Sequence, residues 1–158
     1  MQDETQYQHK YKHLKKESIA LVKHLILDKK FFRQDEVNKL ILLDFLNKEL
    51  CKIYNTKEIC KIKIDTYNDG YFNFFNGIIA LSHKVSLITF LHEFKHFLQT
   101  QRNKENSEEI ARGWSISLFF QASPKHFFRA LNKGLILHQK TLSNLFADYE
   151  SDYSDEIK

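Results

Sequence analysis

The hydrophobic pattern of the chain changes its period twice, and this restricts the fold more than any other feature. Residues 59–82 contain short β-branched and aromatic stretches, separated by the tight-turn sequences Asn68-Asp69-Gly70 and Asn76-Gly77. On both sides of this region, apolar residues recur at helical spacing. The segments with helical spacing are residues 7–29, 35–54, 86–103 and 107–121. Helices, then a small sheet, then helices predict an α+β fold.

Two reversing turns in short succession predict a three-stranded antiparallel meander. Its strands are expected around Ile59, Ile62 and Ile64, then over 71–75 and 78–82. Residues that favour helix ends support the helical assignments. Expected N-terminal caps are Asp35, Ser86 and Ser123, with Pro124 at a first helical position, Gly134 ending that helix and a last helical stretch over 141–147.

Length and composition predict one domain. The chain has 158 residues, of which 42% are hydrophobic and 14% aromatic, enough to form one core. We expect a single domain over 1–147, composed of a helical N-terminal part (1–58) and a core (59–134). Residues 148–158 contain five acidic side chains and one lysine, a composition typical of a disordered tail.

The sequence indicates a cytoplasmic protein without membrane contact. No segment resembles a signal peptide or provides the roughly 20 apolar residues of a membrane-spanning helix. Cys51 and Cys60 lack CxxC spacing and are expected to be free thiols. The net charge is +4, and the acidic tail contributes −4, so residues 1–147 carry about +8. A solvated lysine-rich surface explains this charge better than DNA binding, because no nucleic-acid-binding motif is present.

One helix carries a motif with a defined chemistry. His92, Glu93 and His96 have H-E-x-x-H spacing within the predicted helix 86–103. Residues four apart share a helix face, so both imidazoles can bind one Zn²⁺ ion at about 2.0–2.1 Å. Glu93 then faces the bound water as a general base. The alternative is a surface helix whose histidines share no role, but the apolar flanks predict a buried helix, in which these groups need partners.

A catalytic zinc site has three protein ligands and an open position. Glu108 and Glu109, at the start of the next predicted helix, are candidates for the third ligand. Acidic residues in a first turn also stabilise a helix through its dipole, so one of the pair can be a ligand and the other a cap. The spacing alone does not distinguish them. Cys51 and Cys60 are candidate ligands only if the zinc site is structural.

An oxyanion-stabilising group is also expected for acyl chemistry. The candidates are Tyr71, His83, His126 and Tyr149. For each of them a structural role is the more common explanation: Tyr71 as a strand packing residue, His83 in a loop and His126 on a helix surface.

Residues 71–134 resemble the gluzincin metallopeptidases, in particular the small ImmA/IrrE-type family and related phage and plasmid proteins. The matching parts are the strand 77–82, the helix 91–99 with its H-E-x-x-H motif, and the run 108–112. The family pattern E-x-x-A-[D/N] implies that Glu108 is the ligand and Glu109 a capping or supporting acid. Arg112 replaces the acidic or amide residue of that pattern and would neutralise Glu109 or face the substrate.

The resemblance implies a zincin-like fold and a zinc-dependent peptidase. Zn²⁺ would be held by His92, His96 and Glu108, with Glu93 as the catalytic residue and a protein or peptide as substrate. We add the hypothesis that the substrate backbone pairs with the strand 78–82. The basic charge is the only indication of a DNA-bound protein substrate. The alternatives are a non-catalytic partner-binding protein with a structural or vestigial zinc site and a DNA-associated protein with an incidental motif.

Overall fold

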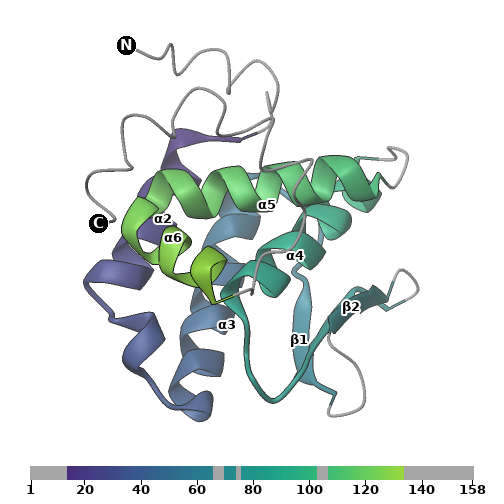
Figure 1. Ribbon diagram of the computed structural model, residues 1–158. Helices are drawn as coiled ribbons and strands as arrows, with labels where there is room; N and C mark the ends of the chain where they lie inside the picture. Colours follow the sequence, from purple (N-terminus) through teal and green to yellow (C-terminus); the bar gives the residue numbers. More distant parts are fainter. Residues whose placement is uncertain (1–13, 66–69, 74–75, 103–106, 134–158) are drawn as a thin grey trace, which may run out of the picture.

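The computed structural model describes residues 14–65, 70–73, 76–102 and 107–133, and it confirms the α+β prediction (Figure 1). The elements in chain order are α2 (Lys16–Leu27), η1 (Phe31–Arg33), α3 (Glu36–Ile53), β1 (Lys61–Ile64), β2 (Gly70–Asn73), β3 (Ile78–Leu81), α4 (Leu87–Gln101), α5 (Glu108–Ala122) and α6 (Pro124–Asn132). Among the described residues, no helix has the length and apolar character needed to span a membrane. Gly134, the stretch 141–147, Tyr149 and the tail 148–158 lie outside the described residues.

Side-chain caps define where several helices begin. The Asp35 carboxylate accepts a hydrogen bond from the Asn38 backbone N–H at 2.8 Å, which starts α3 as predicted. Ser86 caps α4 in the same way, through the backbone N–H of Thr89 at 3.2 Å. Ser123 occupies the N-cap position of α6 but makes no side-chain cap bond.

The sheet is mixed, and the predicted antiparallel meander was wrong. The strand order is β1-β3-β2, with β3 antiparallel to β2 and parallel to β1. A turn sequence specifies that the chain reverses direction, but it does not require the two flanking strands to pair. β3, with three of its four residues buried, occupies the centre, whereas the lysine-bearing β1 lies at an edge. The strand 78–82 is therefore no edge strand, as substrate pairing with it would require.

β2 begins at a glycine because a side chain would not fit there. Gly70 has a φ of 146°, and a Cβ at this position would collide with the Cγ2 atom of Thr89 on α4. The start of β2 thus packs directly on the helix that carries the H-E-x-x-H motif.

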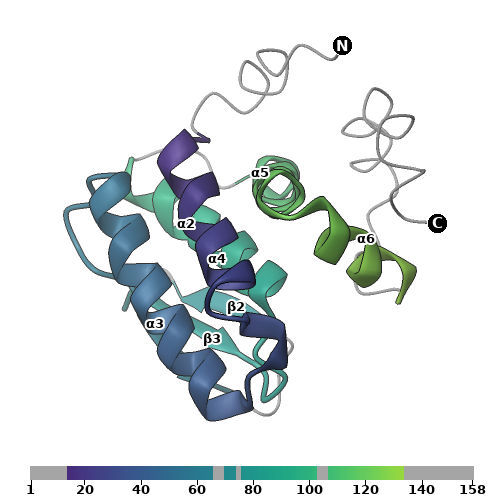
Figure 2. The ribbon, with the colours of Figure 1, turned by 90° about the vertical axis from the view of Figure 1, so that its left-hand side faces the viewer.

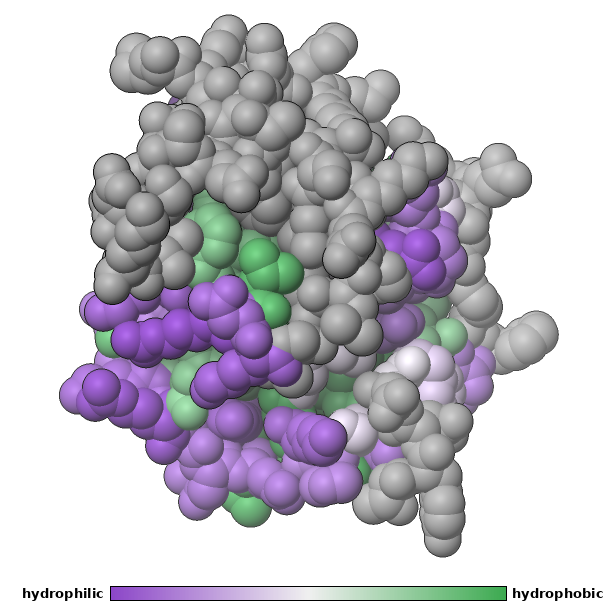
Figure 3. Space-filling view, viewed as in Figure 1, coloured by the Kyte–Doolittle hydropathy of each residue, from purple (hydrophilic) through white to green (hydrophobic). Residues whose placement is uncertain are grey.

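α4 is the central element of the core. It packs against β2 and β3 on one side and against α5 and α3 elsewhere. Phe90, Phe94 and Phe97 of α4 are fully buried, and Phe94 stacks against Trp114 of α5 with ring centroids 6.3 Å apart. The N-terminal helices α2 and α3 run side by side and contribute to the same hydrophobic cluster (Figure 2). The described part of the face in Figure 3 is mainly hydrophilic, with small separate hydrophobic areas.

Candidate metal centre

The apolar residues of α4 determine which face of the helix carries its polar side chains. Because the three phenylalanines face the core, His92 and His96 share the face turned toward the start of α5. Their ring centroids are 4.9 Å apart, and their Nε2 atoms are 3.2 Å apart. The side chain of His96 is only 4% exposed and that of His92 19% exposed.

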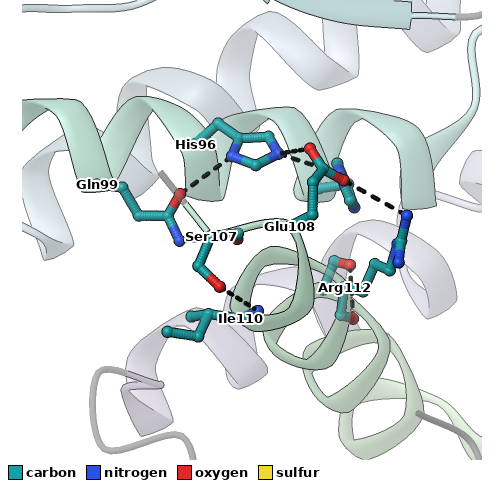
Figure 4. A network of polar contacts seen from close by, with 8 residues as sticks. His96, Gln99, Ser107, Glu108, Ile110 and Arg112 are labelled. Carbon is teal, nitrogen blue, oxygen red and sulfur yellow. Dashed lines mark hydrogen bonds and ion pairs between the residues drawn. The ribbon is translucent and has the colours of Figure 1, made fainter. Parts of the chain in front are cut away.

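The first turn of α5 brings the third group to these rings (Figure 4). The Ser107 hydroxyl caps the helix through the Ile110 backbone N–H at 3.2 Å, which places Glu108 at the first helical position. One Glu108 carboxylate oxygen lies 2.6 Å from His96 Nε2, and the other lies 3.1 Å from His92 Nε2. The structure thus brings together the three predicted ligands, His92, His96 and Glu108. Glu109 is exposed and is not part of this group.

Two of the three spacings between these atoms are close to those expected around a tetrahedral zinc ion. Ligand atoms about 2.0–2.1 Å from a tetrahedral ion are about 3.3 Å from one another. The distances from His92 Nε2 to His96 Nε2 and to Glu108 Oε2 are 3.2 and 3.1 Å, close to that value. The contact between His96 Nε2 and the other Glu108 oxygen, Oε1, is shorter, at 2.6 Å. Two imidazoles and one carboxylate are also a known ligand set of catalytic zinc sites.

Electrostatics favour the protonation states that metal binding requires. Burial is the largest effect on His92 and lowers its pKa, so the neutral imidazole predominates. Burial by itself would raise the pKa of Glu108, but His92, His96 and Arg112 together outweigh it and hold that pKa below its usual value. A neutral imidazole and an ionised carboxylate are the forms that bind a cation.

Glu93 is half-buried and lies close enough to His96 and Glu108 to interact with both electrostatically, but it is not part of the metal-binding group. Burial raises the pKa of its carboxyl group; His96 and a hydrogen bond with the Phe72 backbone lower it, and Glu108 raises it. Burial is the strongest of these effects, so the pKa lies above the ordinary value of 4.5. A carboxyl group with a raised pKa is suited to accept and return a proton near neutral pH.

This raised pKa gives a testable dependence of stability on pH. A carboxyl group whose pKa is higher in the folded state than in the unfolded state destabilises the fold increasingly as the pH rises through these values. Glu93→Gln keeps the side-chain shape without the charge. With a chelator present, we expect equal stability near pH 4 and a more stable variant at pH 8, measured by thermal unfolding. A variant less stable than wild type at pH 8 would contradict the effect of burial.

Two residues of the centre make contacts that the sequence analysis did not predict. Gln99, which was not singled out, contacts His96 Nδ1 through its side-chain oxygen at 3.0 Å. Its position three residues after His96, on the same helix face, was the available signal. Arg112, predicted to neutralise Glu109 or face the substrate, has its guanidinium 3.8 Å from the Glu108 carboxylate, and the substrate-facing role stays a prediction.

The described candidates for oxyanion stabilisation have other partners. The Tyr71 hydroxyl donates to Asp65 at 3.1 Å, and His83 is exposed in a turn. His126 contacts the Ser123 hydroxyl at 2.7 Å and belongs to α6. Glu108 is the first residue of α5, whereas α6 follows the other end of that 15-residue helix. None of the three described candidates for oxyanion stabilisation therefore contacts the metal-binding group.

The two cysteines are free, as predicted, and both are buried. Cys60 donates to the Gly77 carbonyl at 3.3 Å, and burial raises the pKa of its thiol to about 12. Cys51 lies within 4.0 Å of the Asn47 side-chain oxygen. Neither thiol belongs to the metal-binding group found among the described residues.

Compared with protein-family models, curated proteins and solved structures, the chain matches none of them. The resemblance to the gluzincins, which rests on the motif and its spacing, therefore stays a prediction.

Proposed function

We propose that this protein is a zinc-dependent endopeptidase with a zincin-like fold, a regulatory or processing protease of the cytoplasm. The observation that supports this most is the convergence of three donor groups from two helices, His92, His96 and Glu108, beside a carboxyl group with a raised pKa. If the two histidines shared no role, nothing would require a carboxylate from a second helix to lie 2.6 and 3.1 Å from their rings.

The residues divide the chemistry between them. A zinc ion held by His92, His96 and Glu108 would supply Lewis acidity, lowering the pKa of a bound water to about 7. Glu93 accepts the proton of the attacking water and returns it to the leaving amine. Burial raises the pKa of Glu93, which brings the carboxyl group closer to the pKa of an efficient general base at neutral pH.

The substrate is a protein or peptide whose extended backbone lies alongside the sheet. β3 is paired on both sides and is unsuitable for this role. β2 is an edge strand of the sheet and packs against α4. The Phe72 backbone hydrogen-bonds to Glu93. We therefore propose that the substrate segment with the scissile bond pairs with β2. A DNA-bound protein substrate has only the positive net charge in its favour.

One observation favours a second candidate, a non-catalytic protein with a structural or vestigial zinc site. Tyr71, His83 and His126 do not contact the metal-binding group, so no oxyanion stabiliser is identified among these described candidates. A binding protein of this kind would hold zinc without hydrolysing peptides.

Cleavage of a mixed peptide substrate separates the two candidates. We expect the purified protein to generate new peptide termini in a proteome-derived peptide mixture, read by mass spectrometry. Treatment with 1,10-phenanthroline should stop cleavage, and one equivalent of Zn²⁺ added after removal of the chelator should restore it. Cleavage that persists after complete metal removal would contradict a zinc peptidase, and zinc binding without new termini would favour the non-catalytic candidate.

A further inference from the structure

Gln99 links the two helices that form the metal-binding group. It lies on α4 three residues after His96 and is 5% exposed. Its side-chain oxygen is 3.0 Å from His96 Nδ1, and its side-chain nitrogen donates to the Ser107 backbone carbonyl at 3.2 Å. In Figure 4, Gln99 and Glu108 lie at the two nitrogen atoms of the His96 ring, on opposite sides.

The Ser107 carbonyl determines how the Gln99 amide is oriented. A carbonyl oxygen only accepts hydrogen bonds, so the amide nitrogen of Gln99 must face Ser107. The amide oxygen then faces His96, and it too only accepts. Nδ1 of His96 must therefore carry a proton. Nε2, the atom that faces Glu108 and His92, is then the ring nitrogen left to bind an ion, which would take the place of the proton in the 2.6 Å contact with Glu108.

The same side chain also positions the third ligand. Ser107 is the N-cap of α5 and immediately precedes Glu108. A hydrogen bond from α4 to the Ser107 carbonyl therefore restrains the backbone at the point where α5 begins. Because Gln99 is buried, an unpaired amide would be costly, and both hydrogen bonds are maintained together.

We propose that Gln99 is a positioning residue of the metal centre. It holds His96 with Nδ1 protonated and Nε2 available, and it restrains the start of the helix that supplies Glu108. This inference rests on the proposed metal site. A partner on the second ring nitrogen of a ligating histidine is typically worth about 10–100-fold in metal affinity.

Zinc affinity in three variants tests the proposal. Gln99→Leu removes both hydrogen bonds at similar volume and should weaken zinc binding about 10–100-fold, measured by chelator competition. Gln99→Glu keeps the acceptor for His96 but loses the donor to Ser107, so it should bind zinc more tightly than Gln99→Leu and more weakly than wild type. Gln101→Leu, the matched control two residues further along α4, should bind zinc as wild type does. The Gln101 side-chain oxygen has no hydrogen-bond partner among the described residues.

A second measurement requires neither bound zinc nor a mutant that folds correctly. In the metal-free wild-type protein, ¹H–¹⁵N NMR should detect a proton on His96 Nδ1 that exchanges slowly with solvent. An unprotonated Nδ1 would overturn the inference, as would Gln99→Leu binding zinc as tightly as wild type. Failure of the wild-type protein to bind zinc is a different result, because it refutes the metal site and leaves the NMR test of the Gln99–His96 contact intact.

Discussion

Glu93→Gln should bind zinc as wild type does and lose peptide hydrolysis. Glutamine preserves the size of the side chain but cannot accept a proton from water, so the general-base contribution of about 10²–10⁴-fold in kcat should disappear. The three predicted metal ligands are untouched, since Glu93 is not part of that group. The measurement is the initial rate of cleavage of a peptide identified in the wild-type digest, with zinc content determined on the same samples.

Glu109→Gln is the matched control for this experiment. It makes the same chemical change on an exposed acid that lies outside the metal-binding group, and its rate should equal that of wild type. Full activity of Glu93→Gln would exclude Glu93 as the base. Loss of zinc from Glu93→Gln would instead show that this carboxylate helps to hold the ion.

The second large effect is expected at the third ligand. Glu108→Ala should bind zinc at least about 100-fold more weakly, because one of three ligands to an ion bound by roughly 10 kcal/mol is removed. Glu109→Ala removes the adjacent acid and should leave zinc affinity unchanged, since Glu109 is exposed and separate from the group. Chelator competition on both proteins measures the effect. Equal affinities, or a loss confined to Glu109→Ala, would contradict the role of Glu108.

The sequence was sufficient where local chemistry decides the structure. Asp35 and Ser86 cap the helices predicted from them, because a cap depends on a side chain and a backbone N–H three residues away. His92 and His96 share a helix face through their spacing alone. The structure also places Glu108, the ligand implied by the family pattern, against both rings.

The sequence was insufficient where packing between distant segments decides the structure. Neighbouring residues on a helix point about 100° apart, so the choice between Glu108 and Glu109 depends on how α5 lies against α4. The position of β3 between β1 and β2 is likewise a property of the assembled sheet. Gln99 acquires its role only because the start of α5 comes within reach of its amide group.

The metal content of the protein purified without added zinc tests the central claim most directly. If His92, His96 and Glu108 form a zinc site, elemental analysis should find close to one zinc per chain in the wild-type protein and little in Glu108→Ala. Wild-type protein without bound metal, or with iron in place of zinc, would contradict the assignment of this centre to a zinc peptidase.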